Sequence, residues 1–254
     1  MSKKTCWIIG ASHGIGEALV QKYFDNGFDL MISARSEEKL QEIRQRILGN
    51  NRNNSNQILV SKVDVCDFSS LQKSCDEIVQ KLQKIDLVIF ASALYQPTKL
   101  LGFDLQKAQE TIQVNLGGAL NLLHVVLPQM TKQKFGHIAL IASVAGYRGL
   151  PQSFAYGASK AGLINLCEGI YPELKTYNID LSVINPGFVK TRLTQKNAFN
   201  MPLIISVEKA ADEIYEGLEK KKFEVHFPKT FTYFLKIFRI LPNWLFIKII
   251  KRIS

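Results

Sequence analysis

The chain is poor in the residues that mark disulfide scaffolds and metal sites. It has four cysteines in 254 residues, none of them in a Cys-x-x-Cys spacing: Cys6, Cys66, Cys75 and Cys167. Their scatter argues against a disulfide framework and a structural zinc site, and it suits a reducing compartment. The four histidines also show no ligand spacing, so we expect no metal dependence.

Long apolar runs and a signal peptide are also lacking. No stretch approaches the ~20 apolar residues that a helix needs to cross a bilayer. Residues 1–4 lead directly into a strand-like run, without the apolar core and cleavage site of a signal peptide. We therefore expect a cytoplasmic protein, and the length fits one large α/β domain or two small ones.

Acidic residues are missing from the last tenth of the chain. The net charge is +10, and half of it comes from five basic residues between Thr230 and Ser254: Lys236, Arg239, Lys248, Lys251 and Arg252. Apolar residues at helical spacing interleave with them, and Pro242-Asn243 breaks the run. Such a segment can lie on the inner face of a membrane, pack against the core or a partner subunit, or cover a pocket. Because no polar basic stripe is formed, we expect no nucleic-acid binding.

Continuous apolar runs alternate with helical patterns along the chain. The runs are residues 5–9, 28–34, 57–63, 86–91, 137–142, 179–184 and 223–227. The helical patterns are residues 15–26, 36–48, 69–83, 105–132, 153–177 (interrupted near Pro172) and 208–222. Strands that are apolar throughout are buried on both faces of a sheet. The alternation predicts an α/β fold: a doubly wound, mostly parallel sheet of the Rossmann type, with about seven strands and helices on both faces.

A glycine-rich turn joins the first predicted strand to the first helix. It contains Gly10, Ser12, His13, Gly14, Ile15 and Gly16. Such a turn directs backbone N–H groups and the helix N-terminus at an anion, and glycine lets a pyrophosphate approach without a Cβ in the way. The strand before it and the helix after it favour dinucleotide binding over a tight turn without a ligand.

Polar residues follow the second and third strands. Arg35 stands where an acid would bind the adenosine ribose, and an arginine there can hold a 2′-phosphate instead. This favours NADP, with NAD as the alternative; otherwise Arg35 is a solvated side chain paired with Glu38 or another acid. Asp64, followed by Val65, either accepts from the adenine amino group or caps a turn.

Tyr156 and Lys160 are four residues apart in a predicted helix, so they share a face. An adjacent ammonium group favours phenolate and lowers the pKa of a tyrosine. Alone, this spacing is typical of a surface pair. Ser143 alone would be a cap, and Asn115 alone a buried amide bonded to backbone. Together with the Asn185-Pro186-Gly187 turn, however, they form one pattern.

These motifs resemble the short-chain dehydrogenase/reductase family over roughly residues 4–190. The resemblance implies an NADP-dependent enzyme that transfers hydride between nicotinamide and a carbonyl or alcohol. In that case Tyr156 is the catalytic acid/base, and Lys160 binds the nicotinamide ribose and lowers the pKa of the tyrosine. Ser143 binds the substrate oxygen, and Asn115 helps to hold a proton-relaying water. The implied cofactor contacts are Gly10, Ser12, His13, Gly14, Ile15, Gly16, Arg35, Asp64, Val65, Ala91, Tyr156, Lys160, Pro186, Gly187, Val189 and Thr191.

The chain departs from the family pattern at two neighbouring places. The family usually has threonine before the first glycine and Asn-Asn-Ala-Gly after the fourth strand. This chain has Ile9 at the first place and Phe90-Ala91-Ser92-Ala93 at the second. We expect Ile9 to pack against Ala91 in place of the hydrogen bonds that the family makes there.

We expect a catalytic domain at 1–227, with a substrate loop at about 191–206, and a basic amphipathic helical extension at 228–254. Apolar residues near the predicted site suggest an apolar substrate: Leu193, Phe199, Met201, Leu203, Tyr95, Tyr147 and Leu150. The family often forms homodimers or homotetramers through the helices that carry Asn115 and Tyr156. A non-catalytic dinucleotide sensor or membrane-associated scaffold is the alternative, but it predicts damaged catalytic residues, and all four are present. A sugar-nucleotide epimerase usually needs a larger substrate domain.

Overall fold

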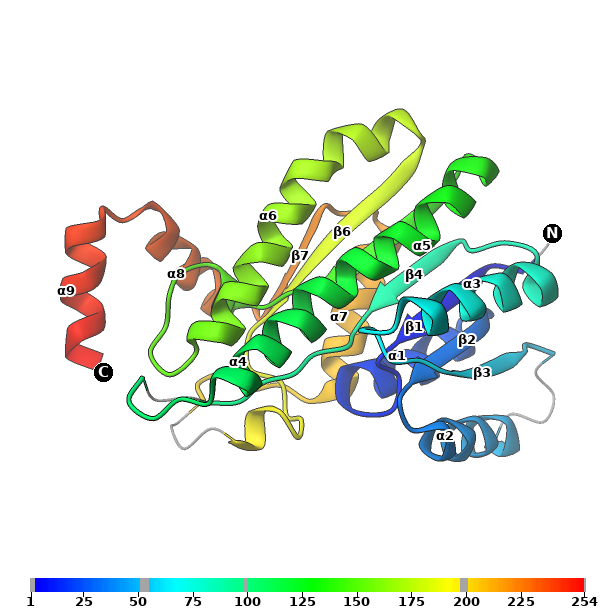
Figure 1. Ribbon diagram of the computed structural model, residues 1–254, viewed down its shortest axis with the longest axis horizontal. Helices are drawn as coiled ribbons and strands as arrows, with labels where there is room; N and C mark the ends of the chain where they lie inside the picture. The colour runs from blue at the N-terminus through cyan, green and yellow to red at the C-terminus, as the bar shows by residue number, and fades with distance from the viewer. Residues whose placement is uncertain (1–2, 51–54, 98–99, 197–200, 254) are drawn as a thin grey trace.

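A parallel β-sheet forms the centre of the molecule (Figure 1). The computed structural model describes residues 3–50, 55–97, 100–196 and 201–253. Within these residues the sheet has seven strands in the order β3-β2-β1-β4-β5-β6-β7, and all neighbours are parallel. The strands are β1 Thr5–Ile9, β2 Asp29–Ala34, β3 Ile58–Lys62, β4 Leu87–Phe90, β5 Gly136–Ile141, β6 Ile179–Pro186 and β7 Glu224–Phe227. The predicted Rossmann-type fold is confirmed.

The order of strands places a switch point in the middle of the sheet. The chain adds β2 and β3 on one side of β1, and then returns to place β4 on the other side. The crossover helices after β1 and β4 therefore leave the sheet on opposite faces, which opens a crevice at the carboxyl ends of these strands. Gly10 and Ala91, which follow β1 and β4, lie side by side at this point, and Ala91 N donates to Ile9 O at 2.8 Å.

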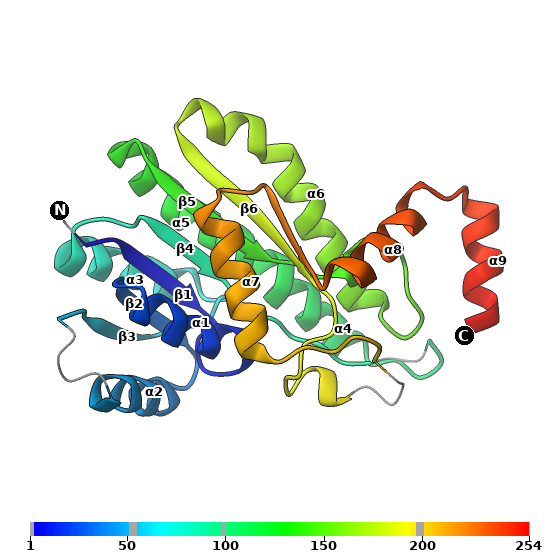
Figure 2. The ribbon, with the colours of Figure 1, turned by 180° about the vertical axis from the view of Figure 1, so that it is seen from behind.

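Helices cover both faces of the sheet (Figures 1 and 2). One apolar cluster joins one face of the sheet to α1 (Gly14–Asp25), α2 (Glu37–Asn50) and α7 (Val207–Glu219). The other joins the opposite face to α3 (Phe68–Leu82), α5 (Gly118–Gln133) and α6 (Phe154–Thr176). The strands are buried on both faces because each cluster takes alternate residues of the same strands, and this explains why their sequences are apolar throughout.

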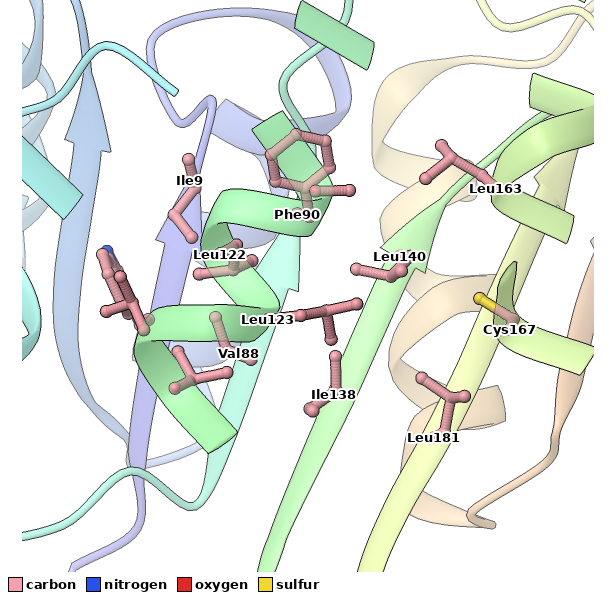
Figure 3. Packing of buried hydrophobic residues seen from close by; sticks show 14 of the residues in the cluster. Ile9, Val88, Phe90, Leu122, Leu123, Ile138, Leu140, Leu163, Cys167 and Leu181 are labelled. Carbon is pink, nitrogen blue, oxygen red and sulfur yellow. The ribbon is translucent and has the colours of Figure 1, made fainter. Parts of the chain in front are cut away.

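The expected packing of Ile9 against Ala91 is wrong. Ile9 pairs in register with Phe90, and both side chains belong to the α5 side of the sheet (Figure 3). Ala91 is the next residue along its strand direction, so its side chain points to the other face, where it packs against the α1 side. The lost polar contact is therefore replaced by an Ile9–Phe90 contact within one core cluster.

Two expected helices differ from their predicted form. The pattern at 105–132 is divided into α4 (Leu105–Ile112), a π-helical turn at Gln113–Gly117, and α5. The π turn contains Asn115, which is the predicted site residue of this helical pattern. Such turns frequently occur at functional sites. In contrast, α6 is not interrupted at Pro172. Pro172 has no N–H group, so the carbonyl of Glu168 has no partner in the helix. Both residues are exposed, so water can bind that carbonyl.

The C-terminal extension forms two helices that project from the β7 edge of the sheet, far from the N-terminus (Figures 1 and 2). They are α8 (Lys229–Ile240) and α9 (Asn243–Ile253), and they meet at the predicted break at Pro242. No helix in the described part of the chain is both long and apolar enough to cross a membrane.

The turn between β1 and α1 depends on a close backbone approach, which gives a first prediction. A Cβ on Gly16 would lie 2.1 Å from Gly10 O. Gly16→Ala should therefore destabilise the protein by about 1–3 kcal/mol in urea unfolding, since the neighbouring atoms are backbone and cannot rotate away. Gly169→Ala is the matched control: it is also helical, exposed and without neighbours within 4 Å. It should stabilise the protein by up to about 1 kcal/mol. Equal effects of the two changes would contradict this packing.

Candidate active site

Two adjoining cavities form one crevice along the carboxyl ends of the central strands. Five residues line both cavities, namely His13, Ala91, Ala93, Arg192 and Leu193, so the crevice is continuous. All sixteen residues predicted to contact the cofactor line one cavity or the other. The site residues therefore come together as the sequence pattern indicates, although they are spread over the chain from Gly10 to Thr191.

The glycine-rich turn leaves its backbone accessible to a ligand in the crevice. Gly10 has a φ of +87°, and a Cβ there would lie 2.5 Å from Ser92 N. Gly14, with a φ of +60°, begins α1, and no side chain caps the N-terminus of this helix. The first N–H groups of α1 are thus available for an anion, which is the requirement for a pyrophosphate. These residues fit a dinucleotide.

His13 and Arg192 contact each other across the crevice. Arg192 Nη1 donates to His13 Nε2 at 2.7 Å, and His13 Nδ1 lies 3.0 Å from Ser12 Oγ. Since Nε2 accepts, Nδ1 carries the proton in this arrangement and donates to the serine. Burial and the charge of Arg192 lower the pKa of His13, which favours this neutral form. Arg192 was not predicted from the sequence, because no motif distinguishes it from other basic residues in the loop.

Arg35 lines the adenosine end of the crevice, directly after β2. Its side chain is exposed, and no carboxylate of the described residues forms an ion pair with it. Glu38, the alternative partner, instead accepts from Ser36 Oγ at 3.1 Å. The Arg35 guanidinium is therefore free to meet a phosphate group.

Asp64 and Val65 line the same end. One carboxylate oxygen of Asp64 accepts from Cys66 N at 2.9 Å, so the residue caps a turn and also faces the crevice. Val65 O accepts from Asn121 on α5, which fixes this loop. The two readings of Asp64 are compatible, because the residue that caps this turn also lines the crevice.

Tyr156 and Lys160 lie one turn apart on α6, beside the end of β5. The Lys160 ammonium lies 5.6 Å from the centroid of the Tyr156 ring, and Nζ donates to Ile141 O at 2.7 Å. A side-chain hydrogen bond joins Ser143 to the Tyr156 hydroxyl, and the Tyr95 ring packs edge-on against the Tyr156 ring with 4.8 Å between the ring centroids. Phenol, hydroxyl and ammonium groups thus converge at the inner end of the crevice.

Burial dominates the titration of this pair. It raises the pKa of Tyr156 to about 12, against the opposing effect of the Ser143 hydrogen bond. It lowers the pKa of Lys160 to about 7, since the lysine side chain is 1% exposed. In the protein alone, the expected lowering of the tyrosine pKa by Lys160 is therefore outweighed by desolvation.

Asn115 lies behind the site and does not line the crevice. It is fully buried, its Nδ2 donates to Leu94 O at 3.0 Å and to Ser159 Oγ at 2.9 Å, and its Oδ1 accepts from Leu94 N at 2.7 Å. Its side chain therefore ties the loop after β4 to the helix of the tyrosine. Both N–H groups are bonded to protein, so this side chain has no N–H group left for the expected water.

Glu224 on β7 is the centre of a polar cluster behind the site that we did not predict. Its Oε1 accepts from Tyr147 Oη at 2.7 Å and from Asn185 Nδ2 at 2.8 Å, and its Oε2 accepts from Lys236 at 2.5 Å. Tyr147 follows the turn of Ser143, Asn185 precedes the Pro186-Gly187 turn, and Lys236 belongs to α8. The carboxylate thus joins two walls of the crevice to the C-terminal extension.

The expected substrate residues divide into three groups. Leu193 lines the crevice and Tyr95 contacts Tyr156. Tyr147 is buried with its hydroxyl on Glu224, so it does not line the site, and Leu203 is 56% exposed, away from both cavities. Leu150 and Met201 are partly buried but line neither cavity, and Phe199 lies outside the described residues.

The comparisons with known proteins agree with this geometry. The family model of the short chain dehydrogenases matches residues 4–201. An uncharacterized oxidoreductase of Myxococcus xanthus is 29% identical over 97% of this chain and 96% of its own. Because the family model covers most of the chain, the protein belongs to the short-chain dehydrogenase family and is an oxidoreductase of the type that uses a nicotinamide cofactor.

Solved structures share the fold. A short-chain dehydrogenase/reductase from Burkholderia phymatum in complex with NAD has a TM-score of 0.83 at 20% identity and covers 92% of each chain. A short-chain dehydrogenase from Sphingobium yanoikuyae in complex with NADPH has a TM-score of 0.80 at 21% identity, over 89% of this chain and 88% of its own. The two neighbours hold different cofactors, so the likeness supports the fold and leaves the choice of cofactor to residues of this chain.

The Glu224 cluster gives a second prediction. Burial raises the pKa of Glu224, but hydrogen bonds from Lys236, Tyr147 and Asn185 outweigh it, and the net shift is downward. At pH 7, Glu224→Gln should destabilise the protein by about 1–3 kcal/mol, because the amide keeps only one acceptor oxygen for three donors and loses the charge that pairs with Lys236.

The pH dependence gives the sign of this effect. A carboxyl with a lowered folded pKa contributes stability above its unfolded pKa of ~4.3 and loses it as the pH falls through the folded pKa. The difference in the free energy of unfolding between the parent and Glu224→Gln, measured in urea, should therefore shrink as the pH falls below ~4.3 and through the lower folded pKa. Glu219→Gln, an exposed position on α7, should change little. A pH-independent difference at Glu224 would contradict the ion pair.

Proposed function

We propose that the protein is an NADP-dependent reductase or dehydrogenase that interconverts a carbonyl compound and its alcohol. The observation that carries this proposal is the Tyr156 hydroxyl, which is hydrogen-bonded to Ser143 and lies beside the buried Lys160 ammonium. These three groups meet at the inner end of a crevice whose outer end has the form of a dinucleotide site.

The residues present fit the chemistry of carbonyl reduction. When bound, the nicotinamide supplies or accepts the hydride. Ser143 and Tyr156 are placed to donate hydrogen bonds to a substrate oxygen on which negative charge develops, and Tyr156 to give that oxygen its proton. Lys160 stabilises the phenolate that remains, and any further positive charge in the crevice lowers the pKa of the phenol from about 12.

The preference for NADP rests on Arg35. Its guanidinium follows β2, lines the adenosine end and has no carboxylate partner among the described residues. A guanidinium can bind the 2′-phosphate of NADP with two hydrogen bonds, whereas NAD offers hydroxyl groups there. The Sphingobium yanoikuyae neighbour holds NADPH, which agrees with this choice, and the Burkholderia phymatum neighbour holds NAD.

The substrate and the assembly are proposed from apolar surface. Tyr95 and Leu193 border the site, which favours an apolar carbonyl or alcohol. Ile112, Leu120 and Phe154 are exposed on α4, α5 and α6, the helices that carry or flank the catalytic residues. Burying them in a second copy supports a homodimer or homotetramer through these helices, which the mass of the protein in solution tests.

Replacement of the catalytic hydroxyl tests the reaction, as a third prediction. Tyr156→Phe should reduce the rate of carbonyl reduction by about 10²–10⁴-fold, since the acid is lost while the ring remains. NADPH binding, measured by fluorescence titration, should be nearly unchanged. Tyr177→Phe, an exposed position just after α6, is the control and should keep full activity. Unchanged turnover in Tyr156→Phe would refute the proposed function. If the parent protein binds NADPH but shows no turnover, the result would favour a dinucleotide sensor.

Replacement of Arg35 tests the cofactor, as a fourth prediction. Arg35→Ser should lower kcat/KM for NADPH by about 10–100-fold, because hydrogen bonds to a charged group contribute ~1.5–3 kcal/mol. The kcat/KM for NADH should change little, so the ratio of kcat/KM for NADPH to kcat/KM for NADH is the quantity to measure. Arg44→Ser, on an exposed part of α2, controls for the loss of one positive charge. A parallel loss with both cofactors would mean that Arg35 does not recognise the 2′-phosphate.

A further inference from the structure

The two C-terminal helices expose an unusual amount of apolar surface. Tyr233, Phe234, Ile237 and Ile240 of α8 are all more than half exposed, and Ile240 is 82% exposed. Positions 233, 237 and 240 follow helical spacing, so they form one stripe with Phe234 at its side. On α9, Trp244 is 71% exposed and Ile247 is 49% exposed. Such a concentration of exposed large apolar residues marks an interaction surface.

The same helices are held firmly to the catalytic domain through their other faces. Lys236 pairs with Glu224 at 2.5 Å, and Arg239 pairs with Glu168 on α6 at 3.2 Å. Arg148, which follows the turn of Ser143, lies 4.5 Å from the Phe246 ring and donates to Asn243 Oδ1 at 2.6 Å. Phe231 of α8 packs beside Gly187. These contacts argue against a mobile lid, because opening would break both ion pairs and expose the buried Phe246 ring.

The charge of the exposed surface limits what can cover it. Lys248, Lys251 and Arg252 are exposed on α9, and no carboxylate of the described residues pairs with them. There is no acid from Thr230 to Ser254. A second copy docked through the same face in a symmetric dimer would bring these cations together without an acid to balance them. The surface therefore suits an anionic occupant with an apolar layer.

We propose that α8 and α9 dock on the surface of a membrane that contains anionic phospholipid. Exposed Trp, Phe and Ile side chains enter the boundary between headgroups and acyl chains, while Lys248, Lys251 and Arg252 meet the lipid phosphates. Residues 100–104, which lead into α4, lie toward the same end of the molecule as α9 (Figures 1 and 2), and Leu100 and Leu101 are 75% and 92% exposed. Phe231 of α8 also packs beside Gly187, which lines the crevice, so docking brings a source of apolar substrate near the proposed site.

The two tryptophans of the chain make this docking measurable. Trp7 is fully buried, and its Nε1 donates to Ser33 Oγ at 2.9 Å, so its emission is insensitive to events at the surface. Trp244 is exposed and belongs to the proposed face. Adding phosphatidylcholine vesicles that contain phosphatidylglycerol, at low salt, should shift the emission to the blue and protect it from iodide. The Trp244→Phe protein should show no shift, and it should still float with the vesicles.

Charge reversal tests the electrostatic part of this fifth prediction. The triple change of Lys248, Lys251 and Arg252 to Glu should weaken partitioning in a flotation assay by at least about a hundredfold, as expected for the loss of three basic contacts. The control changes Lys73, Lys132 and Lys134 to Glu; these exposed lysines of α3 and the end of α5 carry the same total charge, and partitioning should fall far less. NADPH binding should be retained in both, which separates docking from the proposed catalytic function.

Three results would overturn the proposal. One is an emission spectrum and flotation profile that anionic vesicles leave unchanged. A second is that Trp244 is already protected from iodide in solution, and that the mass of the protein in solution falls when Ile240 and Trp244 are replaced by Ser. Together these would mean that a second copy covers the face. Equal partitioning of the two triple variants would likewise show that the bound surface lies elsewhere.

Discussion

The burial of the Lys160 ammonium is the constraint on which the site depends. A lysine with one backbone acceptor, Ile141 O, would ordinarily avoid the interior, and desolvation by burial lowers its pKa to about 7. The surrounding framework holds it there: β5 supplies the carbonyl, α6 supplies the lysine and the tyrosine, and Asn115 fixes α6 to the loop after β4. The buried ammonium is thus held in place by several elements together.

The C-terminal extension belongs to the same framework. Glu224 accepts from Tyr147 behind the Ser143 turn and from Asn185 before the Pro186-Gly187 turn, and Lys236 of α8 neutralises it. Both walls of the nicotinamide end are thus connected to α8 through one carboxylate. The extension is therefore more than an appendage, because its inner face supports the crevice while its outer face remains free for another surface.

The sequence predicted the framework better than its local packing. Apolar runs located the strands, since a parallel strand buried on both faces leaves a continuous signal. The same rule could not say which side chains point to which face, and so the Ile9–Ala91 contact was wrong: register places Ile9 beside Phe90. The π turn at Asn115 was also missed, because its one extra residue per turn hardly alters an apolar pattern that long. The helix through Pro172 continues because the exposed side of α6 tolerates an unpaired carbonyl.

By itself, the order of residues determined which chemical groups this protein has: a glycine-rich turn after a buried strand, an arginine after the next one, and a tyrosine and lysine one helical turn apart. These are local features, and short-range spacing is enough to reveal them. Only the tertiary structure decided the environment of those groups, namely the desolvation that raises the pKa of Tyr156, the contact of Arg192 with His13, and the choice of Glu224 as the shared partner of Tyr147, Asn185 and Lys236. Each of these depends on residues that are far apart in the chain, whose distances are set by how the sheet brings strand ends together.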